Sequence, residues 1–468
     1  MGSLSGLFNL SRSALAADQS ALNATANNVA NQNTVGYTRQ VVSWQAGDSV
    51  RLSSVGEVAS TGPSTTTKSV RDRILEQRVQ LQTQTQSATS ARADTLAQME
   101  GVFSLTGSAA SPGATAIGTA LNSFFSSLSG LAANPSDAAT RQGVLSAAST
   151  LATTFNSAAN QLAAISTGIN QTVQSSVAAI NGLTATIARL NKAIGSASPG
   201  GDAGALEDQR QVAIAQLSQY VGLDQVTTEG NGITLTTQGG AVLVSAGAAF
   251  TLTASTSARS TRIADSTGAD VTAGVQGGSV GGLLTAQSVD LPSATSALDA
   301  LAYRVATAVN AQNQAGINYT GNAGGPIFSV PTTASGAAFG LSVVASSPSD
   351  VAAASPGEGP GGNTNGNALA DLAQGLDSSG QTIFGQLGAL LSGVGTSSSA
   401  LQEQNATEQA SLTQLETQRD SLSVVSLNEE AANLALYQKS YEAAAKLLTV
   451  LDSLMASAIN LGSATTVA

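Results

Sequence analysis

Few side chains in this sequence could do chemistry. The 468 residues include no His and no Cys, which excludes thiol nucleophiles, imidazole bases, Ser-His-Asp relays and zinc sites built on sulfur or imidazole. Adjacent carboxylates occur at Glu207-Asp208 and Glu429-Glu430. Because neighbouring residues in a helix point about 100° apart, neither pair can flank one substrate as an acid and a base. We therefore predict no catalytic residue, no cofactor site and no metal site.

Three other groups have structural explanations. Gly277-Gly278 with Gly281-Gly282 lacks the Lys of a phosphate-binding loop and is better interpreted as a tight turn into a helix. Arg71-Asp72-Arg73 is interpreted as a salt-bridge cluster, solvated or between subunits, in which each exposed pair contributes about 0 to 1 kcal/mol. Tyr37 and Trp44 fit packing within a hairpin better than a ligand platform. None of the three groups predicts a binding site.

Composition narrows the class of partner. Only 10% of the residues are charged, against about 25% in an ordinary soluble domain. The 29 acidic and 18 basic residues give a net charge of -11, which argues against binding to nucleic acid or to an anionic membrane surface. Polar residues interrupt the start of the chain and the first basic residue is Arg12, so we predict no secretory signal peptide. Residues 142–188 carry no charge but contain several Asn and Gln, so a bilayer helix is not expected there.

The two ends of the chain have the strongest helical pattern. We predict one helix over residues 4–32 and another over 427–461, the second begun by a capping box of Ser426 and Glu429. Apolar residues recur every seven positions in both helices, a narrow seam that requires a partner helix. The predicted assembly interface consists of Phe8, Leu15, Leu22, Val29, Leu427, Leu434, Tyr441, Leu448 and Met455.

The rest of the chain divides by composition and periodicity. Apolar residues spaced by three and four indicate a helical bundle, and β-branched runs between paired glycines indicate strands. The predicted fold is mainly α, with long terminal helices forming a coiled-coil layer, a central helical bundle and a small β-rich inserted domain. The predicted domains are 1–40 plus 426–468 (terminal coiled coil), 41–222 plus 281–328 plus 369–425 (hairpin and bundle), 223–280 (outer β-rich insert) and 329–368 (irregular, rich in Gly, Pro and Ser).

An Asn-rich turn ends the first helix, and it is the most specific local feature. Asn side chains satisfy backbone groups at a helix end and tolerate the left-handed conformation. Residues 27–40 resemble the N-terminal motif of the bacterial flagellar axial proteins, the rod, hook and hook-associated proteins, and residues 426–434 resemble their C-terminal motif. The motif residues are Asn27, Asn28, Asn31, Asn33, Gly36, Tyr37, Arg39, Glu429, Glu430 and Asn433.

Interior segments resemble the hook-associated members of that family. They occur in the expected order at residues 121–125, 131–135, 187–191, 208–210, 277–284 and 310–313. The resemblance implies a structural, non-enzymatic protein that self-associates in a ring at the hook-filament junction, outside the cell, and is required for filament assembly. It also implies contacts with the hook protein and the second junction protein.

The resemblance further implies export through the flagellar type III apparatus. A small cytosolic chaperone is then expected to bind the apolar stripe of the C-terminal helix. Two alternatives remain open at this point. The chain could be another axial protein, such as the hook protein or the second junction protein, or an exported adhesin or enzyme that uses residues 223–275 as the active unit on an axial scaffold.

Overall fold

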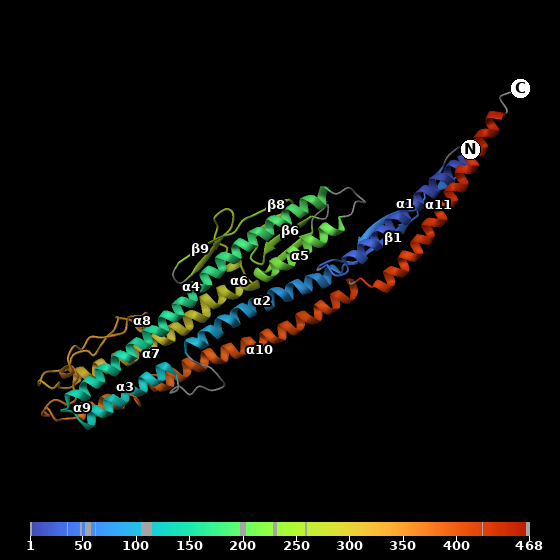
Figure 1. Ribbon diagram of the computed structural model, residues 1–468. Helices are drawn as coiled ribbons and strands as arrows, with labels where there is room; N and C mark the ends of the chain where they lie inside the picture. The colour runs from blue at the N-terminus through green and yellow to red at the C-terminus, as the bar shows by residue number, and fades with distance from the viewer. Residues whose placement is uncertain are drawn as a thin grey trace.

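Long helices dominate the computed structural model and give it an elongated shape, with both chain termini at one end (Figure 1). The structure describes the chain except residues 1, 35, 47–48, 52–57, 61, 104–114, 197–202, 228–231, 258–259, 424 and 465–468. The predicted fold class, mainly α with a small β-rich part, is confirmed.

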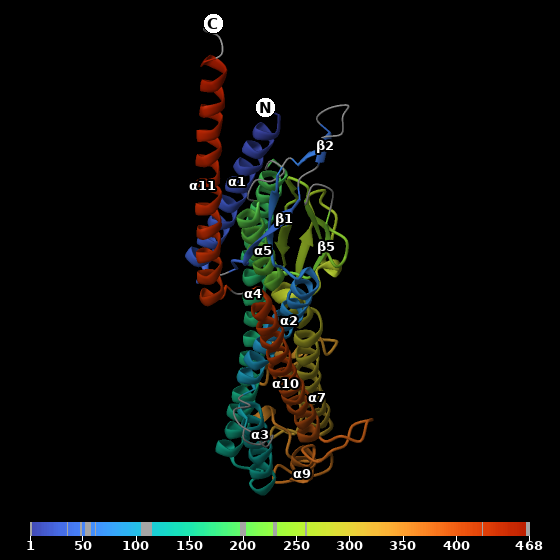
Figure 2. The same ribbon diagram turned by 90° about the vertical axis from the view of Figure 1, so that its right-hand side faces the viewer.

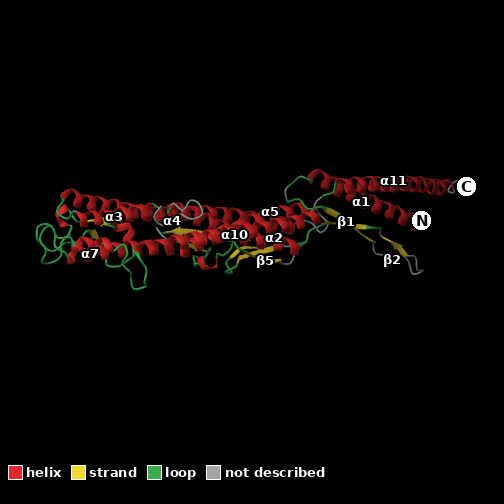
Figure 3. Cartoon of the chain, turned by 90° about the horizontal axis from the view of Figure 1, so that it is seen from below, coloured by secondary structure: helices red, strands yellow, loops and turns green. Residues whose placement is uncertain are grey.

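The two terminal helices pack along each other. α1 (Gly2–Asn31) and α11 (Leu427–Ala464) form a pair that projects beyond the rest of the molecule (Figures 2 and 3). On the described part of α1 the buried apolar residues are the small Ala17, Ala21 and Ala24, which allow a close approach of the two helices. On α11 one row of buried or half-buried apolar residues is spaced alternately by three and four: Leu434, Tyr437, Tyr441, Ala444, Leu448, Leu451, Met455 and Ala458. That spacing is the seam of a coiled coil.

A bundle of helices forms the body of the molecule. Its members are α2 (Arg73–Val102), α3 (Ala116–Ala133), α4 (Ala138–Ser196), α5 (Gly204–Tyr220), α6 (Gly278–Thr285), the π-helical turn η4 (Ala286–Asp290), α7 (Leu291–Ala315) and α10 (Ile383–Ser423). α10 packs along α2, and α3 and α5 pack along α4. The Phe124 ring lies 5.5 Å from the Phe125 ring and 5.6 Å from the Phe328 ring, both in edge-on contact. The bundle therefore has a dense apolar core of its own.

Two groups of strands accompany the helices. After α1 the strands β1 (Gln40–Gln45) and β4 (Ser64–Ser69) pair antiparallel, and β2 (Ser49–Arg51) pairs with β3 (Val58–Ser60). Next to α4 and α5 lies a four-stranded antiparallel sheet with a separate strand pair beside it. The sheet contains β5 (Leu223–Thr227), β6 (Ile233–Thr237), β7 (Val242–Ser245) and β8 (Ala248–Ala249), and the pair contains β9 (Thr253–Thr256) and β10 (Thr261–Ala264), followed by η3 (Thr272–Gly274).

The β-rich segment shares the core of the bundle. Leu235, Leu243 and Ile263 are fully buried in the same cluster as Leu217 of α5 and Val280 of α6. We predicted residues 223–280 as a β-rich inserted domain, and that division stays a prediction; the strands β7, β8 and β9 pack against α4. Its position on the outside of an assembly stays a prediction.

Residues 329–368 fold into short elements at the far end of the bundle. They include or adjoin β11 (Phe328–Ser329), α8 (Ala337–Gly340), β12 (Ser342–Val343), η5 (Pro348–Asp350) and α9 (Thr364–Asp371). The chain between these elements is irregular, but Val351, Ala352 and Ala353 are fully buried. This segment is therefore built into the core despite its composition.

Asparagine side chains attach the irregular segments to the helices. Asn181 of α4 donates to the Leu252 carbonyl and accepts from the Leu252 amide, both at 2.8 Å. Asn310 of α7 does the same with the Phe328 carbonyl and the Ile327 amide, again at 2.8 Å. A carboxamide offers the same donor and acceptor as a neighbouring strand, so it satisfies buried backbone groups without a charge. This explains how so weakly charged a chain is held together.

Candidate assembly interface

The predicted seam lies largely between the two terminal helices of one chain. Phe8, Leu15 and Leu22 are half-buried on α1, whereas Val29 is exposed. On α11 the seam residues Leu434, Tyr441, Leu448 and Met455 are half-buried. Leu427, at the start of α11, is exposed. We expected the seam to be buried only on assembly. Within one chain most of it is already partly covered, because α1 packs along α11, and its contact with other copies stays a prediction.

A second apolar row on α11 is open to solvent. Its members are the large residues Leu436, Leu447, Val450 and Leu454, each of them 51% to 62% exposed. The positions 447, 450 and 454 have helical spacing, so these side chains share one face of the helix. Contiguous exposed apolar surface of this kind is unusual on a monomer and marks an interaction surface. The sequence prediction did not include this row, because it was based on a repeat of seven residues. The spacing by three and four could have identified it.

Asn28, near the end of α1, is the best connected residue of the Asn-rich motif. Its Nδ2 donates to the Gln40 carbonyl at 2.8 Å, and its Oδ1 accepts from the Gln40 amide at 2.8 Å. The same Oδ1 accepts from the Tyr37 hydroxyl at 2.8 Å. Asn28 is 1% exposed, so these bonds are shielded from water. They fix the direction in which the chain leaves α1 and enters β1.

Arg39 joins the two ends of the chain. Its Nε donates to Glu430 Oε1 at 2.8 Å, and its second guanidinium nitrogen donates to Glu429 Oε1 at 2.6 Å. The bond to Glu429 is the main cause that raises the pKa of Arg39. The Arg39 amide also donates to the carbonyl of Ser423, the last residue of α10, at 3.2 Å. One residue of the N-terminal motif thus holds both the end of α10 and the start of α11.

Thr38 ties the same joint to the bundle. Its amide donates to Asp208 Oδ2 at 3.1 Å, and its hydroxyl accepts from Arg71 at 3.0 Å. Arg71 in turn forms an ion pair with Asp208 of α5. Gly36 has a φ of +81°, and a Cβ atom there would clash with the Val212 side chain of α5. The turn after α1 therefore fits against the bundle only with glycine at this position.

The structure brings part of the predicted motif together. Asn28, Tyr37, Arg39, Glu429 and Glu430 meet at this joint. The other asparagines of the motif lie apart from this joint. Asn31 donates to the Asn27 carbonyl one helical turn earlier. Asn33 is exposed, and Asn433 is half-buried on α11. The sequence did not identify Asp208 as a partner, because its position relative to residue 38 depends on the packing of α5.

Two expectations for the residues after α1 were wrong. The run Arg71-Asp72-Arg73 does not act as one solvated cluster. Arg71 pairs with the buried Asp208, and Asp72 caps α2 by accepting from the amides of residues 74 and 75. Trp44 packs on Tyr437 of α11, with ring centroids 6.3 Å apart, rather than on Tyr37. Both differences arise because elements distant in sequence supply the partner.

At the start of α11 and of α6, one expectation needs correction and one is confirmed. α11 begins at Leu427 as the capping box predicted, but the Glu429 carboxylate binds Arg39 instead of returning to Ser426. Gly277 and Gly278 have φ values of +65° and +60°. Gly277 precedes α6 and Gly278 begins it, so the tight turn is confirmed.

Within the described part of the chain, no group of three or more acidic side chains could hold a metal ion. No described helix is long and apolar enough to span a membrane.

Comparisons with protein families match both ends and the middle of the chain. A model described as the helical domain of flagellar hook-associated protein FlgK matches residues 96–328. A flagellar basal body rod protein model matches residues 8–38, and a model of the C-terminal part of the basal body rod FlgEFG proteins matches residues 419–461. The first of these terminal matches covers most of α1 and ends one residue before Arg39, and the second includes Glu429, Glu430 and most of α11.

Individual relatives match over nearly the whole chain. Flagellar hook-associated protein 1 of Bacillus subtilis is 27% identical over 496 residues, which cover 96% of each chain. Flagellar hook-associated protein 1 of Escherichia coli is 26% identical over 559 residues, which cover 98% of this chain and 100% of the relative. The structure of the flagellar hook junction protein FlgK from Burkholderia pseudomallei superposes with a TM-score of 0.66 at 20% identity, over 75% of this chain and 100% of the other. It shares the fold.

Proposed function

This chain belongs to the family of flagellar hook-associated protein 1, and from that premise we propose that copies of it form the ring that joins the hook to the filament of a bacterial flagellum. Its role is structural. The paired terminal helices contact neighbouring copies along the axis, and the bundle lies outside them. The hook protein and the second junction protein are its neighbours on the two sides of the ring, and filaments do not assemble without it.

The joint at Arg39 is the observation that supports this proposal most directly. Motifs from opposite ends of the chain meet there in one ion-pair cluster, between a helix pair with an exposed apolar row and a bundle with a closed core. A subunit that must fit two different neighbours needs such a division, because one part packs between copies while the other keeps its own fold. Uncharged polar surfaces suit burial between copies, since ions lose hydration energy there.

Packing alone performs this function, so no catalytic step is proposed. Many weak contacts repeated around a ring hold each subunit in place. The alternative of an adhesin or enzyme active unit at residues 223–275 receives less support, because those strands share the core of the bundle and have no closed core of their own.

Export and chaperone binding form part of the proposal. The chain leaves through the flagellar type III apparatus and acts outside the cell. Before export, a small cytosolic chaperone covers the apolar row of α11, since an amphipathic helix with an open apolar face suits capture in a groove.

Imaging of purified hooks with an epitope label on this protein tests the proposed location. The label is expected at the distal end of the hook, and cells without the protein are expected to have hooks but no filaments. A label along the whole hook would identify another axial protein instead. A screen of the full-length chain for hydrolase activity and glycan binding addresses the adhesin or enzyme alternative, and we expect no signal.

A further inference from the structure

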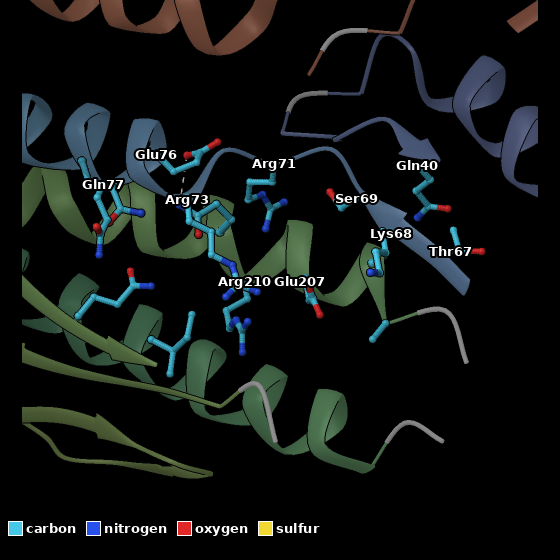
Figure 4. Close-up of a pocket in the computed structure, with 16 residues that line it drawn as sticks. Gln40, Thr67, Lys68, Ser69, Arg71, Arg73, Glu76, Gln77, Glu207 and Arg210 are labelled. Atoms are coloured by element: carbon cyan, nitrogen blue, oxygen red, sulfur yellow. Dashed lines mark hydrogen bonds between the residues drawn. The ribbon is translucent and has the colours of Figure 1, made fainter. Parts of the chain in front are cut away.

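A polar pocket lies beside the joint between the terminal pair and the bundle. It is bordered by β4, the start of α2, the start of α5 and the edge of the four-stranded sheet, and its volume is about 520 Å³. Figure 4 shows Arg71, Arg73 and Arg210 with Lys68 and Glu207 around this space. The volume falls within the range of about 300 to 1,000 Å³ that is typical of ligand sites. The Arg39 cluster does not line the pocket, so the function proposed above leaves it without a role.

The lining has an excess of positive charge. Four cationic side chains line it, Lys68, Arg71, Arg73 and Arg210, against the carboxylates Glu76 and Glu207. The chain as a whole is acidic, with 29 acidic and 18 basic residues, so this gathering of cations runs against its composition. Burial lowers the pKa of Arg210; the Glu207 carboxylate opposes this shift, and the charges of Arg71 and Arg73 add to it by smaller amounts. Arg71 already pairs with Asp208, so a negative group in this space would mainly neutralise the charges of Arg73 and Lys68.

Buried polar atoms in the lining have no hydrogen-bond partner within the described part of the chain. They are Nε of Arg71, Oγ of Ser69 and Oε1 of Gln225. Leaving such atoms unpaired in a folded protein is unfavourable, and they commonly mark a place that water or a ligand fills. Ala203 and Gly204 at the start of α5 also line the pocket, and Ala203 has no side-chain acceptor to cap the first amides. Backbone donors at the start of a helix favour an anion.

We propose that this pocket binds an acidic peptide segment, with a carboxylate between Arg71 and Arg73 and its backbone against the amide side chains of the lining. Glutamine contributes much of the remaining surface, through Gln77, Gln211 and Gln225 among others. A carboxamide both donates and accepts, as each peptide group does, so several glutamine side chains can pair with a peptide backbone. The lining and the volume therefore favour a peptide over a free inorganic anion.

The proposal is tested on the full-length monomer, so its outcome does not depend on ring formation. The probes are the acidic dipeptide N-acetyl-Asp-Glu-amide, its neutral counterpart N-acetyl-Asn-Gln-amide and inorganic phosphate, each titrated by calorimetry and by NMR of the glutamine side-chain amides. We expect the acidic dipeptide to bind, to shift the Gln211 and Gln225 signals, and to bind several-fold tighter than the neutral dipeptide and phosphate.

A matched pair of variants locates the site. Arg73→Gln removes an exposed cation from the pocket lining, and Arg78→Gln removes another exposed cation from the same helix outside the lining. Arg73→Gln is expected to weaken dipeptide binding roughly tenfold, as loss of a charge-assisted hydrogen bond does, while Arg78→Gln leaves it within about twofold. Circular dichroism checks that both variants fold.

Three results would overturn the proposal. The first is no binding of the acidic dipeptide to the wild-type monomer, which would leave a pocket filled by water. The second is equal weakening by Arg73→Gln and Arg78→Gln, which would show a general effect of net charge. The third is phosphate binding at least as tight as the dipeptide with the same dependence on Arg73, which would identify a site for inorganic anions.

Discussion

The central bundle and the terminal helix pair bury their apolar residues in different ways. In α3 and α4 large side chains such as Leu121, Phe124, Leu151 and Phe155 are completely buried. In the pair, three alanines and Leu451 are the buried apolar residues of the described part of α1 and α11, and large side chains of α11 remain open. The bundle satisfies its apolar surface within one chain, whereas the pair keeps a surface that only another molecule can cover.

This difference separates folding from assembly. A core that is closed within one chain makes the bundle stable before the subunit reaches its place. A pair of long helices with large apolar side chains exposed is marginal in isolation, since helices gain most of their stability from packing. Changes in the bundle should therefore affect the monomer, and changes on the open face of α11 should affect the assembled state.

Truncation of a core residue is expected to have the largest effect on the monomer. Phe155→Ala should lower the free energy of unfolding of the bundle by about 3 to 5 kcal/mol, because it opens a cavity in a fully buried site. The matched truncation Leu454→Ala, at a side chain 51% exposed, should change it by less than about 0.5 kcal/mol. Denaturant unfolding followed by circular dichroism measures both. Similar losses for the two variants would contradict the division between bundle and pair.

A charge on the open face of α11 should abolish assembly without unfolding the monomer. Leu454→Asp places a carboxylate that water solvates in the monomer but that would be desolvated between copies, at several kcal/mol for each subunit. Cells with this variant should make hooks without filaments, while the purified monomer melts as the wild type does.

Leu448→Asp is the matched control on the covered face of the same helix. Leu448 is half-buried in the seam with α1, so this variant should already loosen the pair in the monomer. Limited proteolysis should then trim α1 and α11 faster than in Leu454→Asp. Equal protease sensitivity of the two variants would show that the seam does not hold the pair together.

Loss of Arg39 should weaken the joint by an intermediate amount. Arg39→Gln leaves the buried Glu430 carboxylate, 2% exposed, without its cationic partner, and breaking a buried ion pair in this way costs about 3 kcal/mol or somewhat more. The expected result is a separate, earlier melting of the terminal pair, with the bundle transition unchanged. Arg419→Gln, at a more exposed arginine paired with its neighbour Asp420, serves as a control and should have little effect. A single unchanged melting transition in Arg39→Gln would contradict the role of the joint.

Local patterns in the sequence identified the terminal helices and part of the joint. The predicted helices 4–32 and 427–461 agree closely with α1 and α11, because a seven-residue apolar repeat is a local property. The motifs at the two ends included Arg39, Glu429 and Glu430, which do meet. The partners of Arg71 and Trp44 could not be predicted in this way. Asp208 and Tyr437 lie far away in sequence, and only the packing of α5 and α11 brings them close.

The smallest expected effect is a pH dependence that arises at the joint from Asp208. Burial raises the pKa of Asp208 above its ordinary value of 3.8, against the opposing bonds from Thr38 and Arg71. The folded protein therefore holds this proton more tightly than the unfolded chain does. Between pH 3.8 and the raised pKa, the folded state binds more protons than the unfolded state. The free energy of unfolding therefore falls as pH rises through that interval. Below it both states are protonated, and Asp208 adds no pH dependence.

Asp208→Asn removes this titration while keeping a side chain of the same size. The free energy of unfolding of the wild type minus that of the variant should fall as pH rises above 3.8 through the raised pKa, because only the wild type loses the contribution of the bound proton. Denaturant unfolding at a series of pH values measures this difference, and Asp72→Asn, at the exposed cap of α2, controls for loss of a nearby carboxylate. A difference that rises with pH over the same interval would mean that Arg71 outweighs burial, and that the joint gains stability from a charged Asp208.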